Sequence, residues 1–241
     1  GGSVLSGPVL YRGVLYVGSG DRKLYALDAL NGEELWTYKT RSWILSTPVV
    51  NENVVAVISR DRYLYILDRK TGRQRLDYGL GSSNSSPVLW DYSIFGVTRN
   101  GWIKSIDWTA KDKLFEKFRQ RLRHNLLVWG LIDSIPEQSG HIWSHMEPTM
   151  EFSSGPVVSM DNIVIASESG HLLAVSMIDG HTQWTFDAGV PLLSSPFSKK
   201  AILYLADSAG NIYHLDSSTG RSKREFSVSS RVTTTPLLHQ G

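Results

Sequence analysis

Cysteine is absent from the 241 residues of this chain, which excludes disulfide bonds, cysteine-ligated zinc, iron–sulfur clusters and thiol nucleophiles. Long apolar runs are absent too: none approaches the roughly 20 residues of a membrane-spanning helix, and the opening GGSVLSGPVL lacks the regions of a signal peptide. The formal net charge of +2 is too small to indicate a nucleic-acid partner. These absences predict a soluble globular piece of protein, but they do not fix its compartment.

The sequence does contain a repeat of about forty residues. A motif of two small residues followed by proline recurs at Pro8, Pro48, Pro87, Pro156, Pro196 and Pro236. Each interval holds the proline-led strand and three further strand-like segments, separated by tight turns with Gly or Asn-Gly chemistry. Four strands per repeat is the unit of a propeller blade.

The predicted fold is therefore all-β, with one β-propeller domain over residues 1–241. Its blades are expected to be four-stranded and antiparallel, with five complete repeats and one strand of a sixth. Such a chain either closes as a five-bladed ring with an added strand or is an excerpt of a ring of about six to eight blades. An open ring leaves exposed sheet edges, which invite pairing with further strands.

One repeat interval is 29 residues too long, and the turn spacing locates the excess. In the other repeats an Asp or Ser and a turn glycine are four residues apart, whereas Asp107 and Gly140 are 33 apart. The insertion, residues 108–139, therefore lies between the third and fourth strands of the third blade. Within Lys111 to Trp129, apolar residues at steps of three and four predict an amphipathic helix. Its apolar stripe comprises Leu114, Phe115, Phe118, Leu122, Leu126 and Trp129.

The opposite face of this helix is basic, which leaves three arrangements open. The stripe packs against the propeller or plugs the mouth of its axis, where each buried side chain contributes roughly 1.5–3 kcal/mol. Alternatively, it docks into a groove of a partner protein. In the third arrangement, Lys111 to Trp129 lies on an anionic membrane surface as a peripheral contact.

Two segments carry a family resemblance. ALDALNGEELW (Ala26 to Trp36) and AVSMIDGHTQW (Ala174 to Trp184) are similar to the tryptophan-docking repeat of the pyrroloquinoline-quinone-type β-propellers. The resemblance implies that the tryptophan packs between blades and that its indole N–H bonds to backbone, a role that suits a large amphipathic ring. The structural docking residues so identified are Trp36, Trp143 and Trp184, while Leu76 and Arg224 occupy the position in the second and fifth repeats.

The resembled family includes quinone- and calcium-dependent alcohol and sugar dehydrogenases. Those enzymes are expected to hold calcium with Glu, Asn and Asp side chains and to use an Asp base, but no position here matches these residues, and the adjacent cysteine pair is missing. His141 and His145 lie about 13 Å apart along a strand, so they cannot share one metal. No catalytic residue and no metal ligand is therefore predicted.

We predict a non-catalytic binding or scaffold module that uses no cofactor and contacts a protein partner. It resembles the propellers that serve as assembly factors at the bacterial envelope, or as sensor domains, and this resemblance implies an extracytoplasmic or periplasmic location. The alternative is a dehydrogenase fragment that binds pyrroloquinoline quinone with calcium.

A further alternative is a sensor domain for a small anionic ligand. Members of the resembled family place ligands on the face formed by inter-blade loops and by the turns between second and third strands. Arg60 and Arg99 fall at equivalent repeat positions, and Arg41, Trp43 and Arg231 lie in inter-blade loops. Together they predict a positive rim for a carboxylate, a phosphate or an acidic peptide. Solvated loop arginines are the competing interpretation.

Overall fold

The computed structural model describes residues 2–112, 116–134, 137–152, 154–229, 232 and 235. Within them the chain forms five four-stranded antiparallel sheets, each with its strands in chain order. The predicted all-β fold with four-stranded blades is thus confirmed. The strand of a sixth repeat, at Pro236, lies outside the described residues.

The five blades follow the five complete repeats. Blade 1 comprises β1 (Val9–Tyr11), β2 (Val14–Gly18), β3 (Lys23–Asp28) and β4 (Glu34–Lys39), and blade 2 comprises β5 (Val49–Val50), β6 (Val54–Ile58), β7 (Tyr63–Asp68) and β8 (Gln74–Gly79). Blade 3 comprises β9 (Val88–Trp90), β10 (Ser93–Val97), β11 (Trp102–Asp107) and β12 (His141–Met146). Blade 4 comprises β13 (Val157–Ser159), β14 (Asn162–Ala166), β15 (His171–Ser176) and β16 (Thr182–Asp187), and blade 5 comprises β17 (Phe197–Lys199), β18 (Ile202–Ala206), β19 (Asn211–Asp216) and β20 (Ser222–Ser227).

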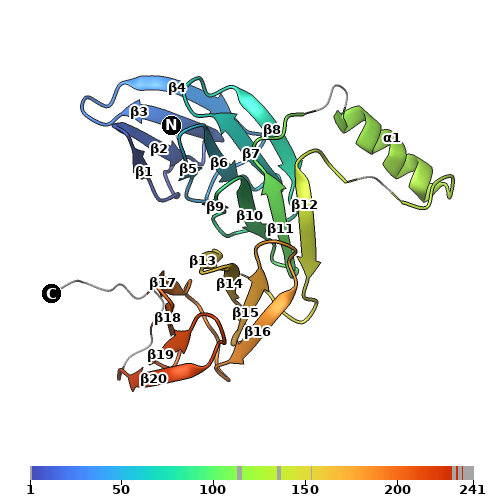
Figure 1. Ribbon diagram of the computed structural model, residues 1–241. Helices are drawn as coiled ribbons and strands as arrows, with labels where there is room; N and C mark the ends of the chain where they lie inside the picture. The colour runs from blue at the N-terminus through green and yellow to red at the C-terminus, as the bar shows by residue number, and fades with distance from the viewer. Residues whose placement is uncertain are drawn as a thin grey trace.

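The blades follow one another along an arc with blades 1 and 5 at its two ends (Figure 1). The first strands of consecutive blades are neighbours, in the order β1, β5, β9, β13 and β17. These strands line the concave side, and the fourth strand of each blade lies on the outside (Figure 1). Residues on the loops and outer strands are consequently the ones that a partner on the convex side would reach.

The hydrophobic core lies between neighbouring blades. Successive side chains of a strand point to opposite faces of its sheet, so each inner blade packs against two neighbours. In β6, Val55 and Val57 pack toward blade 1, whereas Val54 and Ala56 pack toward blade 3. This two-sided burial explains why β6, β10 and β14 appear in the sequence as apolar runs without clear alternation.

In every blade the turn between the second and third strands has one residue in the left-handed region, always at the same position of the repeat. Glycine occupies this position at Gly101 (φ 87°), Gly170 (φ 93°) and Gly210 (φ 98°), but arginine occupies it at Arg22 (φ 74°) and Arg62 (φ 75°). A side chain at positive φ costs free energy that glycine avoids. In both arginine turns the preceding aspartate accepts a backbone N–H bond from the residue two positions later, and this Asx turn supports the conformation.

The insertion carries the helix α1 (Glu116–Val128), which lies between β11 and β12 in sequence. It stands outside the arc, on the convex side, at the end of two connecting segments (Figure 1). The sequence predicts a helix from Lys111 to Trp129. Residues 113–115 lie outside the described ranges, Lys111 and Asp112 are not helical, and α1 ends at Val128. Across the part of the chain that the structure describes, no helix is both long and apolar enough to cross a membrane.

Candidate functional site

Three tryptophans lie at boundaries between consecutive blades. The indole N–H of each donates to a backbone carbonyl of the next blade: Trp36 to Arg69 at 3.0 Å, Trp143 to Met177 at 2.9 Å and Trp184 to Ser217 at 3.0 Å. Each ring also covers a turn glycine of that next blade; a Cβ added at Gly180 would lie 2.5 Å from a ring carbon of Trp143. The three rings therefore fix each blade against its successor by one hydrogen bond and one close packing contact.

The boundary between blades 2 and 3 is built differently. Leu76 is buried in the tryptophan position and covers Gly140, where an added Cβ would lie 2.8 Å from its Cδ2 atom. An aliphatic side chain packs against the glycine but donates no hydrogen bond. The side chain of Arg224, at the equivalent position of blade 5, lies outside the described residues.

The two legs of the insertion are bonded to the outer strand of blade 2, although the insertion belongs to blade 3. Asp112 N–H donates to Arg75 O at 3.2 Å, and the Asp112 carboxylate accepts from Gln74 Nε2 at 3.0 Å. On the returning leg, Gln138 Oε1 accepts from Gly79 N–H at 2.8 Å. These bonds satisfy part of the otherwise open edge of β8. The legs therefore belong to the body of the propeller, and α1 extends from them.

Three of the four described members of the apolar stripe are exposed. Phe118 is 67% exposed, Leu122 46% and Trp129 67%, and Leu126 is half-buried. Gln120 and Arg121 of the helix line a cavity of about 370 Å³ against β8, and Arg121 also borders the stripe. At about 100° per residue, Gln120 lies on the opposite side of the helix from Phe118 and Leu122, so the stripe points away from the propeller.

Phe118, Leu122 and Trp129 therefore do not pack against the propeller. Leu114 and Phe115 lie outside the described residues.

The residues expected to form one positive rim make separate contacts instead. Arg41 pairs with the buried Asp77 carboxylate at 3.1 Å, and its guanidinium lies 4.6 Å from the Tyr63 ring centroid. Arg60 lies over the exposed Trp43 ring at 5.8 Å. Arg231 lies outside the described residues. Arg99 lines a cavity together with two other cations.

That cavity, which we call the basic cleft, has a volume of about 520 Å³ and lies between blades 2 and 3. It is lined by the three cations Arg62, Arg99 and Lys104, by Ser82, Asn100 and Trp102, and by residues 79–81. Sequence reasoning selected Arg99 and missed Lys104 of the same blade and Arg62, which lies across a blade boundary. Lys104, however, stands three residues before Asp107, at the position that Tyr25 and Tyr65 occupy in their own repeats.

Lys104 is the partly buried cation of the basic cleft. Its Nζ atom lies 5.5 Å from the Tyr78 ring centroid and 5.8 Å from that of Trp102, and it donates to Gly79 O at 3.4 Å. Burial lowers the pKa of Lys104, and the Glu137 carboxylate opposes this shift. The cleft therefore presents a cation whose hydration is already partly lost, which strengthens its attraction for an anion.

Tyr78 links the basic cleft to the returning leg of the insertion. Its hydroxyl lies 2.9 Å from His141 Nδ1, and the two rings are stacked with 6.3 Å between centroids. Burial lowers the pKa of His141 below its ordinary value of 6.5; Glu137, 3.8 Å away, raises it, and Lys104 lowers it further. Burial likewise raises the pKa of Tyr78. The folded protein thus favours a neutral His141.

Acidification is expected to destabilise the protein partly through His141. Because the folded-state pKa lies below 6.5, the unfolded chain binds more protons between those two values. The stability that the neutral His141 contributes is fully present above about pH 6.5 and is lost as the pH falls. Urea unfolding gives the free energy of unfolding at pH 7.5 and at about pH 5.5. The decrease between these two pH values should be smaller for His141→Gln than for the unchanged chain. Equal losses would show that this imidazole does not sense pH.

The quinone and calcium of the resembled dehydrogenases can be tested against the residues present. In the described ranges no three His, Asp or Glu side chains gather where they could hold a metal ion. Calcium requires several oxygen ligands around one point. A calcium site built from three such side chains is therefore absent from the described residues.

Comparison with known families and structures gives the following matches. A family model described as outer membrane protein assembly factor BamB matches residues 1–112 and 129–239. The match passes over residues 113–128, which include all of α1. No curated protein sequence matches the chain.

Several solved structures share the fold. The computationally designed Ika8 protein is 14% identical with a TM-score of 0.74, and the alignment covers 99% of this chain and 66% of that one. BamB from Moraxella catarrhalis is 15% identical (TM-score 0.57, covering 98% and 80%), and quinohemoprotein alcohol dehydrogenase from Comamonas testosteroni is 13% identical (TM-score 0.68, covering 94% and 43%). The chain thus spans less than two thirds of the Ika8 protein and less than half of the dehydrogenase. At these identities the likeness is one of fold.

Proposed function

Because this chain belongs to the family of outer membrane protein assembly factor BamB, we propose that it is a non-catalytic β-propeller scaffold that binds a protein partner through α1. We place its action outside the cytoplasm, at the bacterial envelope, in keeping with the family description. The proposal requires no cofactor. The blades supply a rigid body, and the insertion supplies the contact surface.

The observation that carries the proposal is the exposure of the apolar stripe. Phe118 and Leu122 project from α1 on the side away from blade 2, and Trp129 follows the helix directly and is as exposed as Phe118. Large apolar side chains in contiguous exposed positions mark interaction sites, because leaving them in water forgoes about 1.5–3 kcal/mol each. Between Phe118 and Leu122 the helix surface has a shallow hollow of about 250 Å³ that Arg121 and Asn125 complete. A partner side chain of moderate size fits there.

The charges around the stripe indicate the chemistry of the partner surface. Arg119, Arg121 and Arg123 are exposed along the same helix. An amphipathic helix of this kind docks by laying its apolar face into a groove, and complementary charges on the rim fix its register. We therefore propose a partner with an apolar groove about 16 Å long, bordered by carboxylates.

Replacing the stripe should abolish partner binding and leave the propeller intact. For Phe118→Ser/Leu122→Ser/Trp129→Ser we expect at least about a hundredfold loss of affinity, because large apolar anchors dominate such interfaces. The thermal midpoint should shift by no more than a few degrees, since these side chains are exposed. Co-purification of envelope proteins with each variant, together with a thermal melt, measures both.

The matched control is Leu127→Ser/Val128→Ser, which removes two exposed apolar side chains of the same helix outside the stripe. Equal loss of partner with the control would remove the special role of the stripe. A collapse of the fold in the stripe variant would show that α1 is part of the core. Loss of sedimentation with anionic lipid vesicles, in place of loss of a protein, would assign the stripe to a membrane surface.

A further inference from the structure

Blade 3 differs from blades 1 and 2 at two positions, one in the turn before the third strand and one in that strand. In blades 1 and 2 a tyrosine of the third strand donates its hydroxyl to an aspartate of the preceding turn, Tyr25 to Asp21 at 2.6 Å and Tyr65 to Asp61 at 2.7 Å. Four residues separate the two members of each pair. At the same spacing blade 3 has Asn100 and Lys104. A neutral phenol and an acid are thus replaced by a cation and an amide.

This replacement, with two arginines from adjacent turns, produces the concentration of positive charge in the basic cleft. Arg62 and Arg99 are exposed, and no carboxylate pairs with either guanidinium within the ranges that the structure covers. The Asn100 carboxamide oxygen accepts from Thr98 Oγ1 at 2.7 Å, which leaves its NH₂ group as a donor. We propose that the basic cleft is a binding site for carboxylate groups, separate from α1 and independent of the function proposed for it.

The choice of carboxylate over phosphate rests on the backbone around the cleft. Phosphate sites are typically built from free backbone N–H groups at turns and helix N-termini. Here those of Leu80 and Gly81 donate to Arg62 O, that of Arg99 donates to Ser82 O, and that of Gly79 donates to Gln138 Oε1. Four backbone N–H groups of the cleft are therefore occupied, so side chains supply most of the recognition, and the planar guanidinium matches the two oxygens of a carboxylate.

The apolar parts of the cleft also restrict the part of the ligand next to its carboxylate. Trp102 is half-buried and lines the cleft beside Lys104. A ligand whose carboxylate reaches Lys104 lays its carbon chain on this ring, which favours a carboxylate on a short aliphatic stem. Two sources have this chemistry: the Asp and Glu side chains of a peptide, and a free di- or tricarboxylate.

The test is a calorimetric titration of the unmodified protein at low ionic strength with three probes: an acidic tetrapeptide of Asp and Glu, citrate, and inorganic phosphate. We expect saturable binding of the peptide or of citrate, and the tighter of these two identifies the source. In Arg62→Gln/Arg99→Gln the dissociation constant should rise at least about tenfold. Arg99→Gln alone provides a milder variant should the double change alter folding, which a thermal melt detects.

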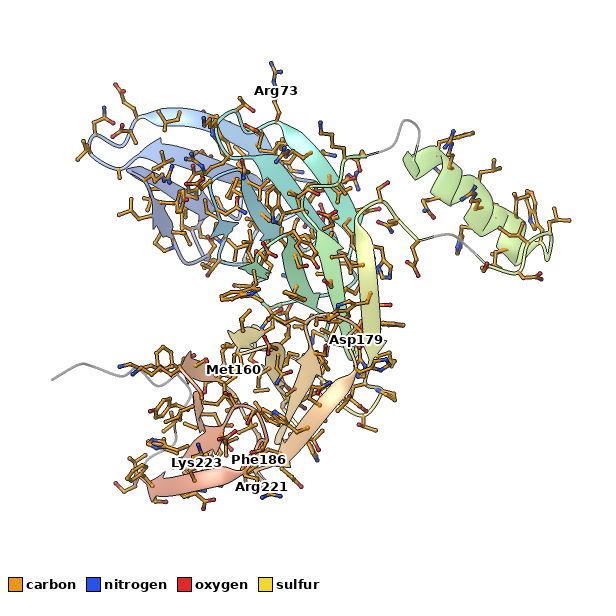
Figure 2. All side chains as sticks on the ribbon, in the orientation of Figure 1. Arg73, Met160, Asp179, Phe186, Arg221 and Lys223 are labelled. Atoms are coloured by element: carbon orange, nitrogen blue, oxygen red, sulfur yellow. The ribbon has the colours of Figure 1, made fainter. Side chains whose placement is uncertain are left out.

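The matched control is Arg22→Gln/Arg73→Gln, which changes the net charge by the same amount elsewhere. Arg22 shares the repeat position and left-handed backbone of Arg62, and Arg73 points away from the blades at the turn before β8 (Figure 2). Binding should be unchanged in this control. Tighter binding of phosphate than of either carboxylate probe, absence of carboxylate binding, or an equal loss in both double variants would overturn the assignment.

Discussion

Replacing Trp143 by alanine is expected to lower the free energy of unfolding by about 3–5 kcal/mol. The ring is only 7% exposed and lies in the core between blades 3 and 4, with its centroid 5.8 Å from that of Phe95. Its removal leaves a cavity at the centre of the arc, and the carbonyl of Met177 loses its donor. Urea unfolding gives the magnitude, and hydrogen exchange should show the largest loss of protection in blades 3 and 4.

The control for this change is Trp90→Ala, the same substitution at a ring that is 53% exposed on β9. Exposed positions without a special contact usually change stability by less than about 0.5–1 kcal/mol. Comparable losses from the two variants would contradict the view that the buried ring holds successive blades together.

The glycine beneath the ring should be almost as sensitive. At Gly180 (φ 73°) an added methyl group meets both the backbone strain of positive φ and the Trp143 ring, 2.5 Å from its Cε3 atom. We expect Gly180→Ala to cost about 2–4 kcal/mol, from roughly 1 kcal/mol of backbone strain and the remainder from overpacking. Thermal or urea unfolding measures it.

Gly32 separates the backbone strain from the overpacking against the ring. It has nearly the same backbone conformation (φ 75°), but an added Cβ meets no atom within 4 Å. Gly32→Ala should therefore cost only the backbone strain, about 1 kcal/mol. If both glycines gave the same loss, the close approach of the Trp143 ring would have no energetic role.

The blades could be predicted from the sequence because the signals for their strands and turns lie within each repeat. Proline-led strands, alternating segments and turn glycines recur at fixed spacing, and the spacing between Asp107 and Gly140 alone locates the insertion. The periodicity of the stripe likewise predicts α1, since a helix is determined by neighbours three and four residues apart. These features require no knowledge of which blades touch.

Contacts across blade boundaries were not predictable in the same way. The periodicity of the stripe does not say which side of α1 meets blade 2, because the bonds from Asp112 and Gln138 to β8 join residues far apart in sequence. For the same reason Arg41 was grouped with Arg99, although it pairs with Asp77. The position of Lys104, by contrast, could have been found by aligning the third strands, where a charged residue replaces a tyrosine.

The most direct measurement of the central claim is photo-crosslinking from the exposed stripe. A photoreactive amino acid placed at Leu122, and at Leu127 as the control on the other side of α1, reports what each side touches in cells. The account predicts a discrete protein adduct from position 122 that position 127 does not form. The same adduct from both positions, no protein adduct, or adducts to lipid alone would contradict a protein-binding scaffold that acts through this helix.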